Sequence, residues 1–287
     1  KLATTSNTSK GLLVTSSGAA SINASDLSGI VSGGKAISNA TVGAYVVDAS
    51  DNWWGTAATS DTAVLALTEG NVDITPYRDA ATTTDLDGGA VGFVGSNSLL
   101  HVTLQGAQYG STGRIQEGVN LVLNGGLVDV LAGTYTEAVS ISGRTGVTLQ
   151  GAGYATTSIV GPHTSPANTA TIDIVGSTGI LVTGFTITRN GNNTTDWATN
   201  GMTYGVRIDG GSANTVQNNL ITGNRSGVDL RNVTSGNTIQ DNRIDSNRTG
   251  MIIWDLANNN LIQRNEITNN WTAGVLFLDT SNEATGN

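Results

Sequence analysis

Residues 205–273 hold three copies of one pattern: GVRIDGGSANTVQNNLITGNRS (205–226), GVDLRNVTSGNTIQDNRIDSNRT (227–249) and GMIIWDLANNNLIQRNEITNNWTA (250–273). The copies are 22 to 24 residues long, and another begins at Gly274. Repetition at this period predicts a solenoid, in which each repeat packs against its neighbours. Asparagines recur at a spacing of 23 residues in three columns: Asn214, Asn237, Asn260; Asn219, Asn242, Asn265; and Asn224, Asn247, Asn270.

Inside each copy the hydrophobic period is two. Val206 and Ile208 alternate with Arg207 and Asp209, and the later copies alternate in the same way. This alternation predicts half-buried strands, and the Gly-, Asn-, Asp- and Ser-rich intervals between them predict turns. The sequence therefore predicts an all-β fold, a right-handed parallel β-helix solenoid with coils of about 22–24 residues. A leucine-rich repeat has a similar length, but its Leu-x-x-Leu-x-Leu signature is missing.

Stacked coils would bring equivalent side chains to about 4.8 Å from each other. The asparagine columns are then expected to form amide ladders at the bends, and Gln217, Gln240 and Gln263 an outward column. Opposite charges align between coils as well, which favours a structural role for them over a catalytic one. The expected pairs are Arg207 with Asp229, Asp209 with Arg231, Asp241 with Arg264, and Arg243 with Glu266.

Composition narrows the classes of partner and compartment. The net charge is −9 over 287 residues, which argues against nucleic acid and anionic membranes as partners. The absence of cysteine excludes disulfides and thiolate chemistry, and it is compatible with bacterial export. No apolar run approaches the ~20 residues of a transmembrane helix, so we expect no membrane insertion. We expect an exported protein, extracellular or at the cell surface, and a piece of a longer polypeptide.

Four motifs outside the regular repeats bear on the family. Residues 51–55 read DNWWG and residues 70–79 read GNVDITPYRD; residues 113–119 read GRIQEGV and residues 128–137 read VDVLAGTYTE. The first two resemble the closing segment, and the last two the opening segment, of pectin-lyase-like right-handed β-helix modules. The resemblance implies a module of a large bacterial surface or adhesin-like protein. It implies no single activity, because that superfamily includes lyases, hydrolases, epimerases, adhesins and inert scaffolds.

These motifs predict the domain organisation. Residues 1–79 are expected to hold the C-terminal coils and the NWWG closing segment of a first β-helix module. Residues 80–112 form a connector and the strand that leads into the second module, and residues 113–287 form that module, with regular Asn-rich repeats from residue 205. A short capping helix is expected near residues 114–123, where Ile115, Val119 and Val122 follow helical spacing. A disordered arm is the alternative for residues 1–50.

Adjacent tryptophans also stand out in a chain that has only five of them. Trp53 and Trp54 are expected to form a hydrophobic plug at a solenoid end, and a platform for a sugar is the alternative. Asp196 and Trp197 lie in an excursion from the regular coils and form a candidate loop site. An ordinary insertion is the alternative there.

Catalytic and metal-binding motifs are scarce. We predict no catalytic, cofactor-binding or metal-binding residue. The best carboxylate pair is Asp255 and Asp279, one coil apart, for which solvated turn residues are the favoured interpretation. His101 and His163 have neither metal-ligand nor triad spacing. Asp85 and Asp87 lack the further ligands of a calcium loop, so Ca²⁺ stays an alternative and no cofactor is expected.

Apolar residues replace charged ones at outward positions in the last copies. We expect a contact patch for another module, another subunit or a sugar, unless a downstream loop covers it or the register slips. Its residues are Ile252, Trp254, Trp271, Leu276 and Leu278.

The sequence therefore predicts a structural or adhesive extracellular β-helix module of a larger surface protein, self-associating into a filament or layer. Its expected partners are copies of itself or neighbouring β-helix modules, with glycans as a further candidate. The alternative is a carbohydrate-active enzyme, a polysaccharide lyase or hydrolase, or a sugar-binding module. A calcium-dependent adhesion module is a third class.

Overall fold

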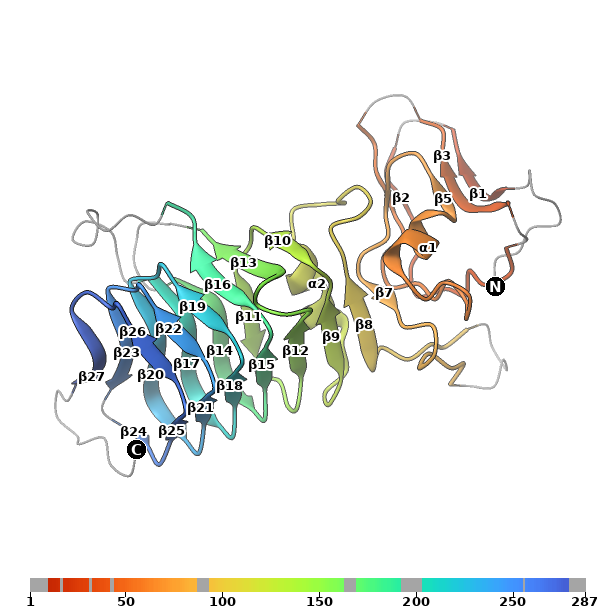
Figure 1. The fold of residues 1–287 in the computed structure, drawn as a ribbon. Coiled ribbons are helices and arrows are strands. Elements are labelled where there is room, and N and C mark those ends of the chain that lie inside the picture. The colour runs from red at the N-terminus through yellow and green to blue at the C-terminus, as the bar shows by residue number, and fades with distance from the viewer. Residues whose placement is uncertain are drawn as a thin grey trace. The chain divides into compact units, whose positions relative to one another are not determined.

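The computed structural model describes residues 10–15, 18–30, 33–41, 44–86, 93–162, 169–191, 203–254 and 256–278. The chain divides into two compact units, Lys1–Val128 and Asp129–Asn287 (Figure 1). The boundaries expected from the sequence motifs stay a prediction.

Short strands, most of them parallel to their partners, build the sheets of unit 1. One sheet has the order β1-β3-β5, and a second has the order β2-β4-β6. β7 and β8 pair antiparallel, with Tyr77 opposite His101. The bounds are β1 (Lys10–Val14), β2 (Ala20–Ser21), β3 (Lys35–Asn39), β4 (Val47–Asp48), β5 (Thr68–Glu69), β6 (Val72–Asp73), β7 (Tyr77–Arg78) and β8 (Leu99–Val102).

Trp54 is part of the hydrophobic core of unit 1. It is 3% exposed and belongs to one buried cluster with Leu27, Ile37, Val72 and Ile74. Its burial there agrees with a packing role for this aromatic ring.

Unit 1 also carries two helices. α1 (Asp61–Leu65) begins after Ser60, whose hydroxyl accepts a hydrogen bond from the Ala63 N–H at 3.2 Å. No sequence pattern described above predicts α1. α2 (Arg114–Leu121) confirms the helix expected near residues 114–123. It packs closely on β8, because a Cβ atom at Gly118 would lie 2.9 Å from the Val102 side chain.

Unit 2 is a parallel β-helix with three strands in each regular coil, and β9 (Leu127–Val130) lies at the division between the units (Figure 1). The first sheet is β10 (Gly133–Tyr135), β13 (Thr157–Gly161), β16 (Thr186–Arg189), β19 (Leu220–Thr222), β22 (Arg243–Asp245) and β26 (Glu266–Thr268). The second is β11 (Val139–Ser142), β14 (Thr169–Thr178), β17 (Thr203–Ser212), β20 (Ser226–Ser235), β23 (Thr249–Trp254) and β27 (Ala273–Leu278), and β24 (Ala257–Asn258) also pairs with β20. The third contains β12 (Thr148–Gly151), β15 (Leu181–Thr183), β18 (Thr215–Gln217), β21 (Thr238–Gln240) and β25 (Leu261–Gln263).

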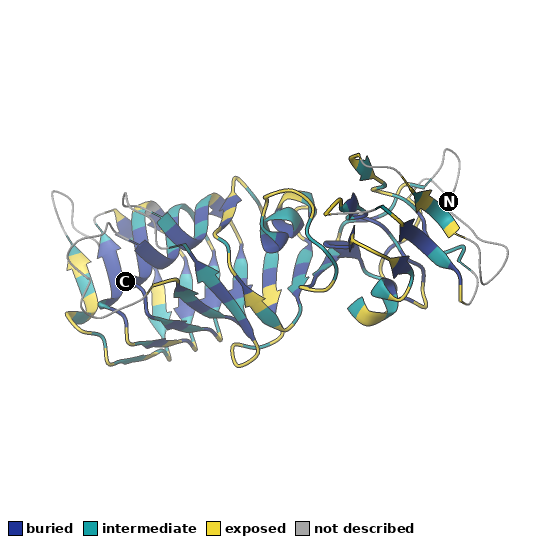
Figure 2. Ribbon diagram, turned by 90° about the horizontal axis from the view of Figure 1, so that it is seen from above, coloured by how far each residue is buried: buried dark blue, intermediate teal, exposed yellow. Residues whose placement is uncertain are grey.

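The core of unit 2 consists of stacked aliphatic columns. Figure 2 shows buried residues interspersed with less buried ones along these strands. Val206 pairs with Val228 and Ile208 with Leu230, and all four are fully buried. The predicted period-two pattern is confirmed, because the alternate positions of each strand point into this core.

An extra residue explains why the first copy of the repeat is one residue shorter than the second. The lead glycines Gly205 and Gly227 are 22 residues apart, whereas the asparagine columns keep a spacing of 23. The register between β17 and β20 shifts between Asp209 and Gly211, so that β20 carries one more residue than β17 there. Asn232, in this interval, adopts a positive φ of 57°. This bulge restores the register of the following bend.

Lead glycines permit neighbouring coils to approach each other closely. A Cβ atom at Gly227 would lie 2.6 Å from the carbonyl oxygen of Gly250 and 2.9 Å from the Ile244 side chain. A side chain at this position would therefore push the coils apart.

The amide ladders are confirmed in all three columns. In each, the side-chain oxygen of one asparagine accepts bonds of 2.9 to 3.2 Å from the backbone N–H and the side-chain amide of its neighbour one coil earlier. Gln217, Gln240 and Gln263 form the outward column, with bonds of 2.8 Å between successive side chains.

Candidate functional site

The outer face of the second sheet of unit 2 carries a cluster of charged and aromatic side chains, which we call the Arg231 cluster. Arg231 donates from Nε to Asp229 Oδ1 at 2.5 Å. Its guanidinium carbon lies 4.6 Å from the centre of the Tyr204 ring and 5.3 Å from that of the Trp254 ring. Trp254 donates from Nε1 to the second oxygen of Asp229 at 2.9 Å. The cluster comprises Asp173, Tyr204, Arg207, Asp229, Arg231 and Trp254.

Arg207 extends this cluster toward the preceding coil. Its Nε and Nη2 donate to the two carboxylate oxygens of Asp173 at 2.8 and 2.5 Å. The repeat predicts that Arg207 pairs with Asp229 and Asp209 with Arg231. The Cα register of both pairs is confirmed, but these ion pairs are arranged differently. Asp173 occupies the same column one coil earlier, and Asp229 binds Arg231 two residues further along the same strand.

Burial shapes the electrostatics of the Arg231 cluster. Asp229 is fully buried, and desolvation raises its pKa, while the bonds from Arg231 and Trp254 act in the opposite direction. Burial also raises the pKa of Tyr204, and the nearby Asp229 carboxylate adds to that effect. The bonds and ring contacts of the cluster connect residues of four successive coils, from β14 to β23. These contacts favour a structural role for the cluster over a catalytic one.

The outer surface of unit 2 also contains a polar groove of about 410 Å³, which we call the charged groove. Arg264 donates to both oxygens of Asp241 at 2.7 Å, and Arg243 lies 4.0 Å from Glu266. Both pairs match the expected cross-coil partners. The hydrogen bond from Arg264 lowers the pKa of Asp241. The groove is lined by Tyr154, Asn219, Asp241, Asn242, Arg243, Arg264 and Glu266, and its side chains suit a polar, solvated ligand.

The expected contact patch is only partly at the surface. The register places Ile252 beside Leu276 and Trp254 beside Leu278, as the sequence analysis assumed. Ile252, however, is 7% exposed and so contributes little surface, whereas Trp271 is 62% exposed. Trp254, Leu276 and Leu278 are half-buried. That these residues bind a partner stays a prediction.

Phe277 adds apolar surface that the sequence analysis did not consider. It stacks beside the fully buried Ile253, yet it is itself 55% exposed, and Val275 on the same strand is 39% exposed. The alternation of β27 already signals these positions, because they continue the inward columns of the earlier coils.

Several candidate residues lie outside the described residues: Asp196 and Trp197 of the loop site, the pair Asp255 and Asp279, His163 and Asp87. His101 is described, and its Nε2 lies 2.9 Å from Asp79 Oδ2. Asp85 accepts a bond from the Val94 N–H at 3.1 Å. Within the described parts of the chain, no group of three or more His, Asp or Glu side chains is arranged to hold a metal ion. The described helices include none that is long and apolar enough to cross a membrane.

Unit 1 contains an acidic cavity of about 240 Å³ that sequence reasoning missed. Asp48, Asp73 and Glu117 line it together with Ser50, Tyr109, Thr112, Asn120 and Leu121. Asp73 is 1% exposed and accepts bonds from the backbone N–H groups of Tyr109 at 2.6 Å and Thr75 at 3.0 Å. Burial raises its pKa. The carboxylates are up to 69 residues apart in sequence (117 − 48), so no local pattern connects them.

Glu117 is the most perturbed carboxyl group in this cavity. Burial, followed by the charges of Asp73 and Asp48, raises its pKa from 4.5 to about 8. The carboxyl group is therefore protonated in the folded protein at neutral pH, and ionised in the unfolded chain. Folding then binds a proton, so Glu117 lowers stability progressively as the pH rises from about 4.5 to about 8.

Glu117→Gln is expected to remove this pH dependence, because glutamine resembles the protonated acid. The variant should gain about 1–3 kcal/mol over the wild type at pH 8 and little at pH 4.5, allowing for solvent screening. Urea unfolding at several pH values measures the difference. Glu69→Gln is the matched control, because the bond from Lys10 lowers the pKa of Glu69. Any change in stability that comes from the titration of Glu69 therefore occurs below pH 4.5. Equal slopes for wild type and Glu117→Gln between pH 5 and 8 would contradict the assignment.

Comparison with known proteins agrees with this geometry. The family model described as "Right handed beta helix region" matches residues 132–287, which is more than half of the chain. Neither a curated protein nor a solved structure matches the chain. The matched residues include the regular coils of unit 2, the asparagine ladders, the Arg231 cluster and the charged groove. The chain thus belongs to the right-handed β-helix family.

Proposed function

We propose that this chain is a structural or adhesive β-helix module of an exported bacterial surface protein. The continuous asparagine ladders carry the proposal, since they bond each regular coil to the next at all three bends. A solenoid bonded in this way resists bending and can hold a binding surface at a distance. Its partners would be other β-helix modules or further copies of the same chain.

The outer charges support the same function. Arg207, Arg231 and Arg264 each bind a carboxylate of the chain itself, at 2.5 to 2.7 Å. These groups strengthen the contacts between and within the coils. The apolar surfaces at Trp271 and Phe277 are then the contacts available to a partner.

Electron microscopy of the purified chain at several concentrations tests this function, together with sedimentation velocity. We expect regular rods or sheets whose mass grows with concentration. Phe277→Glu should abolish assembly if coils stack end to end, because Phe277 continues an inward column. Trp271→Glu should abolish it if modules associate through their sides. Monodisperse single particles at every concentration would overturn self-association.

A second candidate function is glycan binding or cleavage in the charged groove. The supporting observation is the combination of Tyr154, which is 49% exposed, with two arginines and two carboxylates around one open groove. Exposed aromatic and charged groups together suit a polysaccharide. A glycan-binding and polysaccharide-cleavage screen tests it, with Tyr154→Ala as the variant expected to lose binding.

A further inference from the structure

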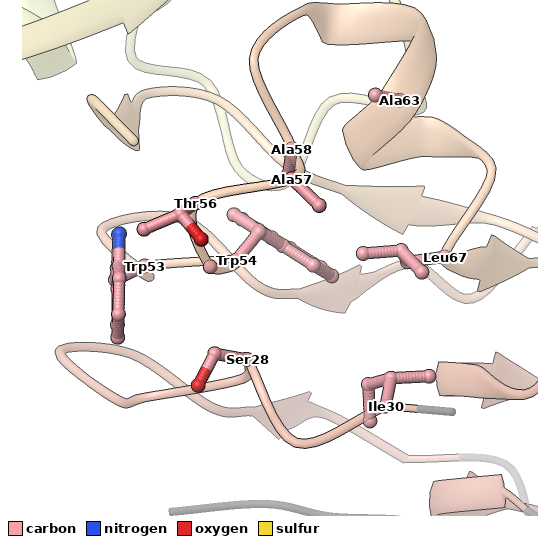
Figure 3. Close-up of a pocket in the computed structure, with 10 residues that line it drawn as sticks. Ser28, Ile30, Trp53, Trp54, Thr56, Ala57, Ala58, Ala63 and Leu67 are labelled. Carbon is pink, nitrogen blue, oxygen red and sulfur yellow. The ribbon is translucent and has the colours of Figure 1, made fainter. Parts of the chain in front are cut away.

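Unit 1 has a second cavity, of about 330 Å³, beside the paired tryptophans. It lies between two neighbouring segments of the chain: the Leu27 N–H donates to the Trp53 carbonyl at 2.8 Å, and Asp26 and Trp53 form a parallel bridge. Ser28 and Ile30 form one side, and Trp53, Trp54 and Leu67 form the other (Figure 3). This volume falls within the range of about 300–1,000 Å³ that is typical of small-molecule sites.

Aromatic rings and small side chains shape this cavity. Figure 3 shows the rings of Trp53 and Trp54 on the side of the cavity that faces Ser28 and Ile30. Trp53 is held by stacking on Phe93, with ring centres 5.8 Å apart and planes 13° from parallel. Trp54 is 3% exposed and therefore fixed by the core. Alanines at positions 57, 58 and 63 also line the cavity, and their small side chains leave space beside the rings.

The polar groups around the cavity are neutral. Among the described residues that line it there is no charged side chain, whereas the hydroxyls of Ser28 and Thr56 are present. The indole N–H groups of Trp53 and Trp54 are buried and have no hydrogen-bond acceptor among the described residues. Because these two nitrogens are closed to solvent, the polar groups that a ligand can reach are the hydroxyls of Ser28 and Thr56. The described lining thus combines aromatic walls with hydroxyl groups and includes no charged side chain.

We propose that this cavity binds one pyranose ring of a neutral glycan. The negative face of an indole attracts the weakly positive C–H groups on the flat side of a sugar ring. The sugar hydroxyls then exchange hydrogen bonds with Ser28 and Thr56 at the edge of the cavity. The absence of charge in the lining selects against uronic acids and sulfated sugars. This site is independent of the structural role of the coils in unit 2.

Titration of the full chain with neutral sugars tests the proposal. The probes are glucose, galactose, mannose and N-acetylglucosamine with their disaccharides, followed by calorimetry and by the indole ¹H–¹⁵N resonances. We expect saturable binding of at least one sugar that shifts the Trp53 resonance. Trp53→Ala should weaken this binding about tenfold or more, since it removes one stacking face.

Ala57→Phe is the variant that keeps the proposal falsifiable if Trp53→Ala fails to fold. Ala57 lines the cavity but is exposed, so a phenyl ring there fills the site without entering the core. Thr59→Phe is the matched control, because Thr59 is exposed on the same segment and does not line the cavity. The proposal is overturned if no sugar binds saturably up to tens of millimolar, or if Ala57→Phe binds as tightly as Thr59→Phe. Binding of the apolar dye ANS alone, lost in Ala57→Phe, would instead assign the cavity to an apolar ligand.

Discussion

Replacing Arg78 by methionine is expected to lower the free energy of unfolding of unit 1 by about 3–5 kcal/mol. Arg78 is 5% exposed, and its Nε and Nη2 donate to the two oxygens of Asp51 at 3.0 and 3.1 Å. Asp51 is itself only 8% exposed. Removal of the guanidinium therefore leaves a buried carboxylate without its counter-charge, and desolvation of that charge opposes folding. Urea unfolding followed by hydrogen exchange on peptides of unit 1 measures the loss.

Two further variants separate this ion pair from a general effect of removing arginine. Arg243→Met should lower the free energy of unfolding by less than about 1 kcal/mol, because the Arg243 side chain is 50% exposed and its carboxylate partners lie 3.8 and 4.0 Å away. Asp51→Asn combined with Arg78→Met should recover part of the loss, because it removes the isolated charge. If Arg78→Met and Arg243→Met lowered the free energy of unfolding equally, the buried pair would contribute no more to stability than the exposed one.

The contact between Asp51 and Arg78 could be predicted only in part from the two sequence motifs that contain these residues. Asp51 begins DNWWG, and Arg78 lies near the end of GNVDITPYRD. Both motifs resemble the closing segment of a β-helix module, so the sequence indicated that they belong together. It did not indicate that the two side chains bind each other, because they are separated by 27 residues without a repeat between them. A contact of this kind depends on tertiary structure.

In unit 2 the sequence predicted the coils, ladders and columns because a fixed period places equivalent residues beside each other. The strand pairing of Arg207 with Asp229 follows from that period alone. Two of the four expected ion pairs formed, Asp241 with Arg264 and Arg243 with Glu266. The pairs expected for Arg207 and Arg231 did not form, because an arginine side chain reaches carboxylates in either neighbouring coil or along its own strand. Arg207 binds Asp173 in the preceding coil, and Arg231 binds Asp229 in its own. A repeat therefore predicts backbone register better than it predicts side-chain partners.

Unit 1 was predicted less completely. Its first 128 residues have no regular period, so the segments that meet at the acidic cavity could not be aligned. Asp48 ends β4, Asp73 ends β6 and Glu117 lies in α2. The tryptophan cavity had one local signal, the adjacent Trp53 and Trp54, and the sequence analysis held both a packing and a sugar-binding interpretation of it. The structure assigns Trp54 to the core and also places a cavity beside it.

Asn219→Ala is expected to lower the free energy of unfolding of unit 2 by about 2–4 kcal/mol. Asn219 is 1% exposed, and its side chain makes bonds in three directions. Its side-chain oxygen accepts a hydrogen bond from the Phe185 N–H at 3.0 Å. Its amide group donates to the carbonyl oxygens of Val182 at 3.1 Å and Gln217 at 2.7 Å. The amide also donates to Asn242 Oδ1 at 3.2 Å, which is the ladder bond to the next coil. Alanine makes none of these bonds, so the buried Phe185 N–H loses its acceptor.

The neighbouring asparagine provides the matched control for this ladder position. Asn218 is exposed and adopts a positive φ of 53°, a conformation that glycine adopts readily. Asn218→Gly should therefore change the free energy of unfolding by less than about 0.5 kcal/mol. Urea unfolding, followed by hydrogen exchange of the peptides around Phe185, compares the two variants. If Asn219→Ala unfolded at the same urea concentration as Asn218→Gly, the ladders would not be what holds successive coils together, and the stiffness on which the structural function rests would need another source.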